Sequence, residues 1–589
     1  MRFLLFLAFG FACSASAELS VHSIFSDHMV LQRGKPIVVW GSATAGEHVD
    51  VDFADQSLHA EVGDDGSWAV TLEPMPKNAE PQDLVVSSGD DEIRITDVLV
   101  GEVWILGGQS NMEHEIHSVY DGDLELASAN YPEIRLMTIP RANGGDPVTN
   151  FEALNEFNSW NNSNELKGNW APCTPEALKK FTAIGYIFGR RIHLVDDVPV
   201  GLIDASRGGT NVETWTSRES LEAIPDALPL LETWDEKIAA YDPAADLAGQ
   251  LKNWERDTEN RKKKGEVPRP KPTEPRPGPA FDQNRPSSCY NGMISAFAGF
   301  TVRGAVFNQG YNNALGDSRP ALYAKTIQAM IRDWRTAFRD EQLPFCIIGM
   351  TAGGKPQTIE TLEVGMIDAT PYIREAQLRA ANEMDGVEFL PAWDQQMAWY
   401  HPFKKVALGE RSARWALVTT MGHNFPWKPA LLAETEIGEG EITLTFDQTV
   451  QSHDGRSFEG FAIAGEDQHF FPAQAEWFVK GKDKNNRDQH DRSKVVISSP
   501  HVPNPVAVRY AWARNPLANV TQDEHHLRNV PVPSFRTDDW PYPEAPFDQD
   551  GLGQHRGRIN ELRKQAEAWA KDRQLLDARR VIAEQEPAE

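Results

Sequence analysis

The chain has 589 residues, and 86 acidic against 58 basic side chains give it a formal net charge of −28. At about 150 residues per domain, this length allows three or four domains, and a hydrophobic content of 40% is too high for a disordered protein. Because binding to phosphates requires cationic surface, the acidic balance argues against nucleic acid as a partner.

The first 17 residues are typical of a secretory signal peptide. Arg2 precedes a short apolar run, and Ala15-Ser16-Ala17 forms a small-x-small cleavage site. An N-terminal membrane anchor is the alternative, but the run is too short for a hydrocarbon core of about 30 Å. We therefore expect an exported protein, secreted or periplasmic, with no membrane span in the remaining chain.

Three cysteines remain after cleavage, namely Cys173, Cys289 and Cys346, so the sequence allows at most one disulfide. No CxxC pair or Cys/His cluster has the spacing of a zinc site. The pair His114 and His117 misses the HExxH spacing by one residue. We expect neither a metal nor another cofactor.

The next segments predict a β domain followed by an α/β domain. Residues 18–97 contain short alternating runs, such as 49–53 and 68–72, separated by Gly- and Asp-rich turns, which indicates a small β-sandwich. Over 98–430, apolar runs at 98–106, 200–203 and 304–307 alternate with helical patterns, notably 323–338. This alternation is typical of an α/β domain with a largely parallel sheet.

An insertion at about 230–285 interrupts the α/β domain. Residues 230–257 have a helical pattern, and six prolines within 261–279 predict an extended excursion. The insertion is either a solvated loop or a rim that contacts substrate. Residues 431–540 return to β character, and 541–589 predict a charged helix that docks on the body, because Arg573 breaks its apolar stripe.

Small and amide residues follow three of the predicted strands. Gly107-Gly108-Gln109-Ser110 follows the first, Gly208-Gly209-Thr210 the second, and Asn308-Gln309-Gly310 with Asn313 the third. Because active sites of α/β proteins form at the carboxyl edge of the sheet, these segments should converge on one pocket. Ser110 is then a candidate nucleophile, with an ordinary N-cap as the alternative. His401 is the candidate base.

These motifs, in this order, resemble the sialate O-acetylesterase group of the SGNH hydrolases. The resemblance covers roughly residues 20–540 and includes Gly107 to Met112, Gly208-Gly209-Thr210 with Glu213 and Trp215, Gln309-Gly310 with Asn313, and His401-Pro402. It implies a flavodoxin-like three-layer SGNH hydrolase core with an N-terminal and a C-terminal β domain.

The resemblance also implies a function and roles for single residues. Ser110 would be the nucleophile and His401 the general base, in a carbohydrate O-acetylesterase that works through an acyl-serine. The Ser110 and Gly209 amides and the Asn313 side chain would form the oxyanion hole. We further expect Gln109, Glu213 and Gln309 to bind the substrate, an acetylated carbohydrate such as an acetylated sialic acid or polysaccharide.

The acid of the triad is missing from both places where this group carries one. Ala398 stands three residues before His401 where an Asp is usual, and Tyr311 follows the Gln-Gly pair where a Glu is usual. We expect Asp394 to replace the acid, with Asp204 and Glu213 as further candidates. The alternatives to an enzyme are a degenerate relative that binds acetylated glycans without turnover and a scaffold for a partner.

Overall fold

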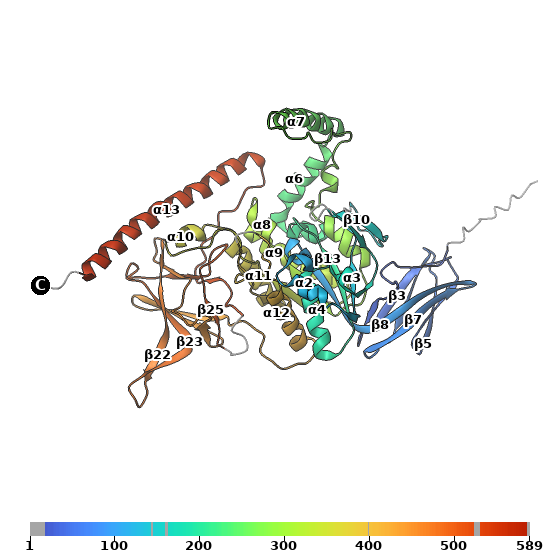
Figure 1. The fold of residues 1–589 in the computed structure, drawn as a ribbon, viewed down its shortest axis with the longest axis horizontal. Coiled ribbons are helices and arrows are strands. Elements are labelled where there is room, and N and C mark those ends of the chain that lie inside the picture. Colours follow the sequence, from blue (N-terminus) through green and yellow to red (C-terminus); the bar gives the residue numbers. More distant parts are fainter. Residues whose placement is uncertain (1–17, 143–144, 159–162, 398–399, 524–529, 586–589) are drawn as a thin grey trace, which may run out of the picture.

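The computed structural model describes residues 18–142, 145–158, 163–397, 400–523 and 530–585, so the expected signal peptide and Ala398 lie outside the described residues. Three parts follow one another along the long axis, with an α/β body between two β parts (Figure 1). The N-terminal strands are β1 (Ser20–Val21), β2 (Val30–Gln32), β3 (Ile37–Ser42), β4 (His48–Phe53), β5 (Gln56–Glu61), β6 (Ser67–Leu72) and β7 (Asn78–Ser88).

A single long strand, β8 (Asp91–Gly108), passes from the N-terminal part into the body. Its first half pairs with β7 in antiparallel fashion, and its second half lies parallel to two strands of the body. The strand bends at Asp97, whose φ of +56° is tolerated best by Asp, Asn and Gly. Arg135 and His28 bind the Asp97 carboxylate at 2.7 and 2.6 Å and hold the bend.

The body is built on a sheet in the order β12-β9-β13-β8-β14-β15-β16, in which only β12 runs antiparallel to its neighbour. The other strands are β9 (Tyr131–Thr138), β12 (Ala171–Cys173), β13 (Val200–Ser206), β14 (Gly304–Asn308), β15 (Phe345–Ile348) and β16 (Val387–Leu390), and β10 (Leu154–Asn158) forms a separate hairpin with β11 (Ser163–Lys167).

Helices pack on both faces of this sheet, because successive side chains of β8 point to opposite sides. Val103 and Ile105 join the core with α9 (Pro320–Ala337) and α11 (Thr370–Glu383). Trp104 and Leu106 join the core with α4 (Ala183–Asp196) and α12 (Val406–Thr419). The parallel α/β character and the helix expected at 323–338 are confirmed.

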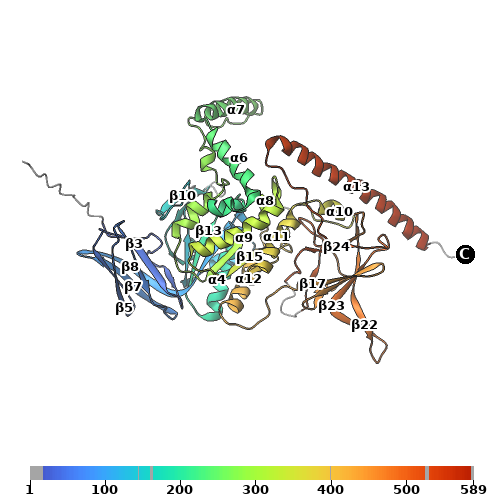
Figure 2. The ribbon, with the colours of Figure 1, turned by 180° about the vertical axis from the view of Figure 1, so that it is seen from behind.

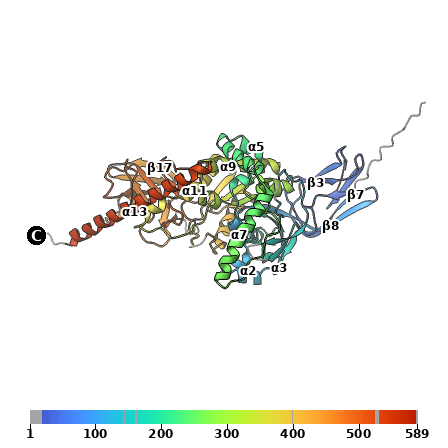
Figure 3. The ribbon, with the colours of Figure 1, turned by 90° about the horizontal axis from the view of Figure 1, so that it is seen from above.

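The insertion forms two helices, α6 (Leu228–Ala239) and α7 (Pro243–Lys263), rather than one. Pro243 starts the second helix, and the Asp242 side chain caps it by accepting from Ala244 N at 2.8 Å. The proline-rich return, 266–278, has no regular structure and packs back on α7, where Trp254 Nε1 donates to Arg269 O at 2.8 Å. Seen from behind, α6 rises from the body and α7 lies beyond it (Figure 2), and seen from above, α7 crosses the body (Figure 3).

The C-terminal part is all-β and carries a long final helix, α13 (Gln549–Gln585). On α13, Trp569 stacks on His469 with ring centroids 4.4 Å apart, and the buried Arg573 donates to Phe470 O at 3.1 Å. Arg573 therefore docks this helix instead of interrupting its packing. The strands are β17 (Leu432–Ile437), β18 (Glu441–Phe446), β19 (Val450–Ser452), β20 (Phe461–Ala464), β21 (Phe470–Pro472), β22 (Gln474–Lys482), β23 (Asp488–Ser498), β24 (Ala507–Tyr510), β25 (Val520–Gln522) and β26 (Phe535–Arg536).

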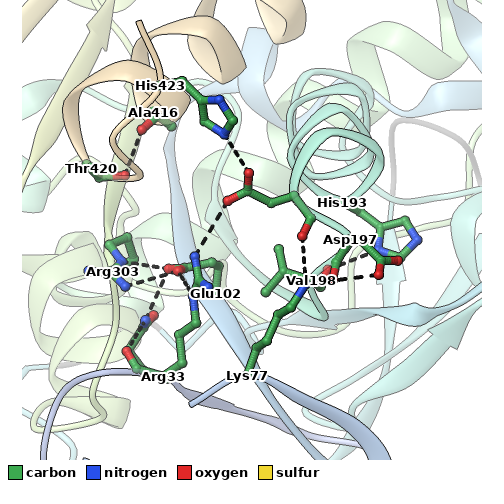
Figure 4. Close-up of polar contacts among 12 residues, drawn as sticks. Arg33, Lys77, Glu102, His193, Asp197, Val198, Arg303, Ala416, Thr420 and His423 are labelled. Carbon is green, nitrogen blue, oxygen red and sulfur yellow. Dashed lines mark hydrogen bonds and ion pairs between the residues drawn. The ribbon is translucent and has the colours of Figure 1, made fainter. Parts of the chain in front are cut away.

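A buried carboxylate joins the N-terminal part to the body (Figure 4). Glu102, on β8, has no exposed surface. It accepts hydrogen bonds from Arg33, from Arg303 at 2.6 and 3.0 Å, and from Gln32 at 3.1 Å. Since a buried charge is tolerated only when it is paired and hydrogen-bonded, these contacts tie two N-terminal residues to the strand.

The three cysteines are buried and free, so the disulfide that the sequence allows is not formed. Within the described ranges, no helix combines the length and the apolar character needed to cross a membrane.

Candidate active site

Ser110 lies where β8 ends, at the carboxyl edge of the sheet, as the first residue of the short helix α1 (Ser110–Glu113). The turn before it depends on Gly108, whose φ is +126° and whose missing Cβ would lie 2.1 Å from Asn308 O. Only glycine allows the ends of β8 and β14 to come this close. The N-cap of α1 is Gln109, not Ser110, so the Ser110 hydroxyl does not cap this helix.

The structure brings Ser110 and His401 together. Ser110 Oγ lies 2.8 Å from His401 Nε2, although 291 residues separate them in the sequence. Both residues are 8% exposed. His401 lies in the segment between β16 and α12, which faces the carboxyl edge of the sheet. A hydroxyl and an imidazole within hydrogen-bond reach are the arrangement that nucleophilic catalysis requires.

Unused donors lie beside Ser110. The Gly208 N–H donates to Glu113 Oε2 at 2.5 Å. Over the described residues, by contrast, no acceptor is bound to the N–H of Gly209 or of Ser110. Gly208 lies against Ser110, since a Cβ added at Gly208 would be 3.3 Å from Ser110 Cβ. These two amides are therefore available to a developing negative charge.

The Asn313 side chain is oriented by the groups around it. Its Oδ1 accepts from Val212 N at 2.9 Å and from Gln309 Nε2 at 2.7 Å, so its Nδ2 is the donor end. Nδ2 donates to Glu213 Oε2 at 2.9 Å. Burial raises the pKa of Glu213. Nδ2 also donates to Glu213 Oε1 at 3.2 Å, so the donor end of this amide faces both oxygens of the carboxylate.

The expected substrate-binding glutamines join the loops of the site to each other. Gln109 Oε1 accepts from Gly310 N at 3.1 Å. Gln309 Nε2 donates to Thr210 O at 3.0 Å in addition to Asn313. Both side chains are almost completely buried, and their contacts hold the turns after β8, β13 and β14 together.

A buried lysine lies beside the Ser110–His401 pair. Lys405 has no exposed surface, and its Nζ donates to Asn111 Oδ1. Asn111 Nδ2 in turn donates to Tyr400 O at 3.1 Å, so the residue after Ser110 is linked to the residue before His401. Burial lowers the pKa of Lys405 to about 7.

The surroundings of His401 favour its neutral form. Burial, together with the nearby Lys405 cation, lowers the pKa of His401 to about 4. The ring of His114 stacks on that of His401 with centroids 5.8 Å apart, and burial with the charges of Lys405, His401 and His117 lowers the pKa of His114 to about 3. A neutral imidazole can accept the Ser110 proton over a wide pH range.

The candidate acids have other partners. Asp394 Oδ1 accepts from Arg411 Nη1 at 2.9 Å, and its Oδ2 accepts from Arg411 Nη2 at 2.5 Å. Asp204 accepts from the Ser206 hydroxyl at 2.6 Å, and burial raises the pKa of Asp204 to about 6. Tyr311, in the usual position of a Glu, points to Thr351, which its hydroxyl binds.

Sequence reasoning missed four residues of this site: Asn111, Glu113, Arg141 and Lys405. Asn111 and Lys405 form the link described above, and Arg141 pairs with Glu113 next to Gly208. Their closeness to the motifs in the sequence is the signal that could have found two of them, since Glu113 lies three residues after Ser110 and Lys405 lies four residues after His401.

Comparison with known proteins supports the resemblance on which these expectations rest. The chain is 25% identical to a sialate O-acetylesterase of Rattus norvegicus over 552 residues, which is 87% of this chain and 93% of the relative. It is 25% identical to one of Homo sapiens over 566 residues, or 89% and 93% of the two chains. No family model matches the sequence.

A solved structure agrees with these relatives. A carbohydrate acetylesterase from Xanthomonas citri superposes with a TM-score of 0.69 at 26% identity and covers 88% of this chain and 100% of its own. The similarity to sialate O-acetylesterases that the motifs indicate is therefore confirmed along nearly the whole chain.

Proposed function

We propose that this protein is an exported carbohydrate O-acetylesterase with a flavodoxin-like three-layer SGNH hydrolase core, in which Ser110 is the nucleophile. The contact of 2.8 Å between Ser110 Oγ and His401 Nε2 carries the proposal. The similarity to a carbohydrate acetylesterase and to sialate O-acetylesterases gives the substrate class, an acetylated sugar. Ser110, His401, the Ser110 and Gly209 N–H groups and the Asn313 amide would supply the nucleophile, the base and the oxyanion donors.

In the first half-reaction, His401 Nε2 takes the Ser110 proton while Oγ forms a bond to the acetyl carbonyl carbon. The carbonyl oxygen becomes an oxyanion, which the N–H groups of Ser110 and Gly209 and the Asn313 amide stabilise. When the tetrahedral species collapses, the bond to the sugar oxygen breaks, and His401 returns the proton to that oxygen. The deacetylated sugar leaves, and acetyl-Ser110 remains.

In the second half-reaction, water attacks the acetyl-serine. His401 takes a proton from the water as the new carbon–oxygen bond forms, and it gives that proton to Ser110 Oγ as the acyl bond breaks. The second proton of the water stays on the product, which leaves as acetic acid and ionises to acetate in solution, and the starting state returns. Because burial and the Lys405 cation lower the pKa of His401, the base is neutral at the start of each half-reaction, as the uptake of a proton requires.

The proposal is tested by acetate release and by labelling. We expect the purified protein to release acetate from 4-nitrophenyl acetate and from acetylated sugars. A fluorophosphonate should modify Ser110 alone, as detected by peptide mass spectrometry. A degenerate glycan-binding protein would release no acetate from either substrate, and labelling at another serine would remove Ser110 from the mechanism.

The Asp394→Asn variant distinguishes two roles of Asp394: an acid that orients His401, and a structural partner of Arg411. Arg411, whose side chain is 4% exposed, binds both oxygens of Asp394. We therefore expect the change to act mainly on folding. An incompletely paired guanidinium should lower the free energy of unfolding by about 1–3 kcal/mol, less than for a fully buried pair because Asp394 is partly exposed.

Thermal unfolding and kcat of Asp394→Asn should be measured beside those of His401→Ala. We expect the folded Asp394→Asn protein to keep far more activity than His401→Ala. If kcat instead falls about 10⁴-fold at an unchanged Tm, Asp394 is the acid that orients His401.

The pH profile of kcat/KM reports the state of His401 in the free enzyme. Since the pKa of His401 is lowered to about 4, we expect kcat/KM to fall below about pH 4 rather than below the ordinary value of 6.5. The sign follows because an imidazolium cannot accept the Ser110 proton. His114, with a pKa of about 3, stays neutral above pH 4.

Lys405→Met should move this acid limb to higher pH, because it removes the cation that opposes protonation of His401. The exposed neighbour Lys404 provides the control variant Lys404→Met, which should leave the limb in place. Initial rates after short pH jumps, with folding followed by circular dichroism, make the comparison. A limb that Lys405→Met leaves in place would separate Lys405 from the titration of His401.

A further inference from the structure

A cavity of about 330 Å³ lies next to the proposed oxyanion site and is lined by segments that are far apart in the sequence, among them Asn211, Glu213 and Asn284. Its other walls come from α6 of the insertion, from the region of the short helix α8 (Tyr311–Leu315), and from the chain just before and at the start of α13. Figure 1 shows α6 and the start of α13 on the same side of the body, above α8. A volume of this size is at the lower end of small-molecule sites.

We infer that this cavity binds a neutral sugar unit next to the acetylated one, which makes the substrate an acetylated oligosaccharide or polysaccharide rather than a free monosaccharide. The inference rests on the proposed function, because it assigns the flanking part of the same substrate.

The cavity adjoins the reacting groups through its asparagines. Asn313, the proposed oxyanion donor, forms part of its wall. Asn284 Nδ2 donates to Gly209 O at 2.8 Å, and Asn312 Nδ2 donates to the same oxygen. Two residues of the cavity wall therefore bind the carbonyl of Gly209, the residue whose N–H would stabilise the oxyanion, and a sugar bound here lies beside the ester under attack.

The chemistry of the lining matches a hydroxyl-rich ligand. Five residues with side-chain amides line the cavity, namely Asn211, Asn284, Asn312, Asn313 and Gln549. Each amide both donates and accepts hydrogen bonds, as a sugar hydroxyl does. Asn211 uses its backbone N–H for a bond to Asn284 Oδ1 at 2.8 Å, and within the described part of the chain its side-chain amide has no hydrogen-bond partner.

The charges of the lining balance, which favours a neutral ligand over an acidic one. Glu213 and Asp317 face Lys237 and Arg319, two charges of each sign. Arg319 donates to Ala545 O at 3.1 Å and to Pro546 O at 2.8 Å, and Asp317 pairs with Arg556 at 3.2 Å. An anionic sugar would therefore meet carboxylates as well as cations.

Trp234, on α6, supplies the aromatic surface of the cavity. It is half-buried, and the Lys237 ammonium lies 5.0 Å from its ring centroid. An indole provides a large, rigid contact area at low entropic cost, and buried tryptophans commonly dominate binding energies. Trp234 is therefore the residue whose loss should weaken sugar binding most.

The chain offers a matched control on the same insertion. Trp254, on α7, is also half-buried and also lies under a lysine, with Lys271 Nζ 5.9 Å from its ring centroid. Trp254 does not line the cavity. The variants Trp234→Ala and Trp254→Ala thus remove the same side chain from the same insertion at two different places.

The experiment compares substrates of different length. Acetylated xylo-, gluco- and manno-hexaoses, the matching acetylated monosaccharides and 4-nitrophenyl acetate are assayed with each variant. We expect at least one hexaose to have a higher kcat/KM than its monosaccharide. Trp234→Ala should raise KM for that hexaose about tenfold or more, and leave 4-nitrophenyl acetate unchanged, whereas Trp254→Ala should change neither.

Three outcomes overturn the inference: no preference for a hexaose, equal effects of the two variants, or a parallel loss on 4-nitrophenyl acetate, which indicates a structural defect. Failure of the proposed function is distinguished because the wild-type protein then releases no acetate from any substrate. In that event, calorimetric titration of the wild-type and Trp234→Ala proteins with the deacetylated hexaoses still tests the cavity. Binding to the wild-type protein that Trp234→Ala weakens would support the inference. An absence of binding to the wild-type protein would overturn it.

Discussion

Ser110→Ala should reduce ester hydrolysis by about 10⁴–10⁶-fold and leave the fold intact. The loss is large because the hydroxyl 2.8 Å from His401 Nε2 is the group proposed to form the covalent bond. The cost to folding should be small, because the N-cap of α1 is Gln109 and Ser110 makes no capping bond. Rates of 4-nitrophenyl acetate hydrolysis and thermal unfolding curves give the two readouts.

The control for this variant is Ser128→Ala, which removes an exposed hydroxyl that bonds only to the carbonyls of Leu124 and Glu125 among the described contacts. It should keep full activity. A folded Ser110→Ala protein with wild-type turnover would contradict an acyl-serine route.

Asn313→Ala should lower kcat by about 10²–10³-fold and change KM much less. The amide is expected to act on charge that develops only as Ser110 attacks, and its donor end is fixed by the bonds to Val212, Gln309 and Glu213. Steady-state kinetics on 4-nitrophenyl acetate make the measurement, because this substrate is too small to depend on the neighbouring cavity.

Asn253→Ala, on the exposed face of α7, is the matched control and should have no effect. An effect of Asn313→Ala confined to KM would assign Asn313 to substrate binding. A fall in Tm that accompanies the fall in kcat would show that Asn313 mainly supports the turn through its contact with Glu213.

The sequence predicts the edge of the sheet and the position of Ser110 because recognisable glycine-rich turns follow the strands. Gly107-Gly108 before Ser110 and Gly208-Gly209 after β13 follow buried runs, and parallel strands bring such ends together. His401 lies 291 residues after Ser110. The His-Pro motif of the resembling group predicts its role, and the periodicity of the surrounding residues does not.

The environment of that pair was beyond sequence reasoning. Lys405 looks like any lysine at a helix start, and only the packing of α12 buries it beside Asn111. Asp394 has a suitable position along the chain, yet its two oxygens meet Arg411, which the helical repeat of α12 places toward the site. Burial and partner choice arise from tertiary packing, which local pattern does not encode.

The unbroken course of β8 connects the N-terminal part directly to Ser110. The strand leaves one sheet, bends at Asp97, passes the buried Glu102 and ends two residues before Ser110. A truncation between the two parts would cut this strand and remove β2 and β7, which pair with its residues before Glu102, while β13 and β14 would still flank its second half. The N-terminal part is therefore a poor place for a deletion, because the strand that it would shorten is the one that ends beside Ser110.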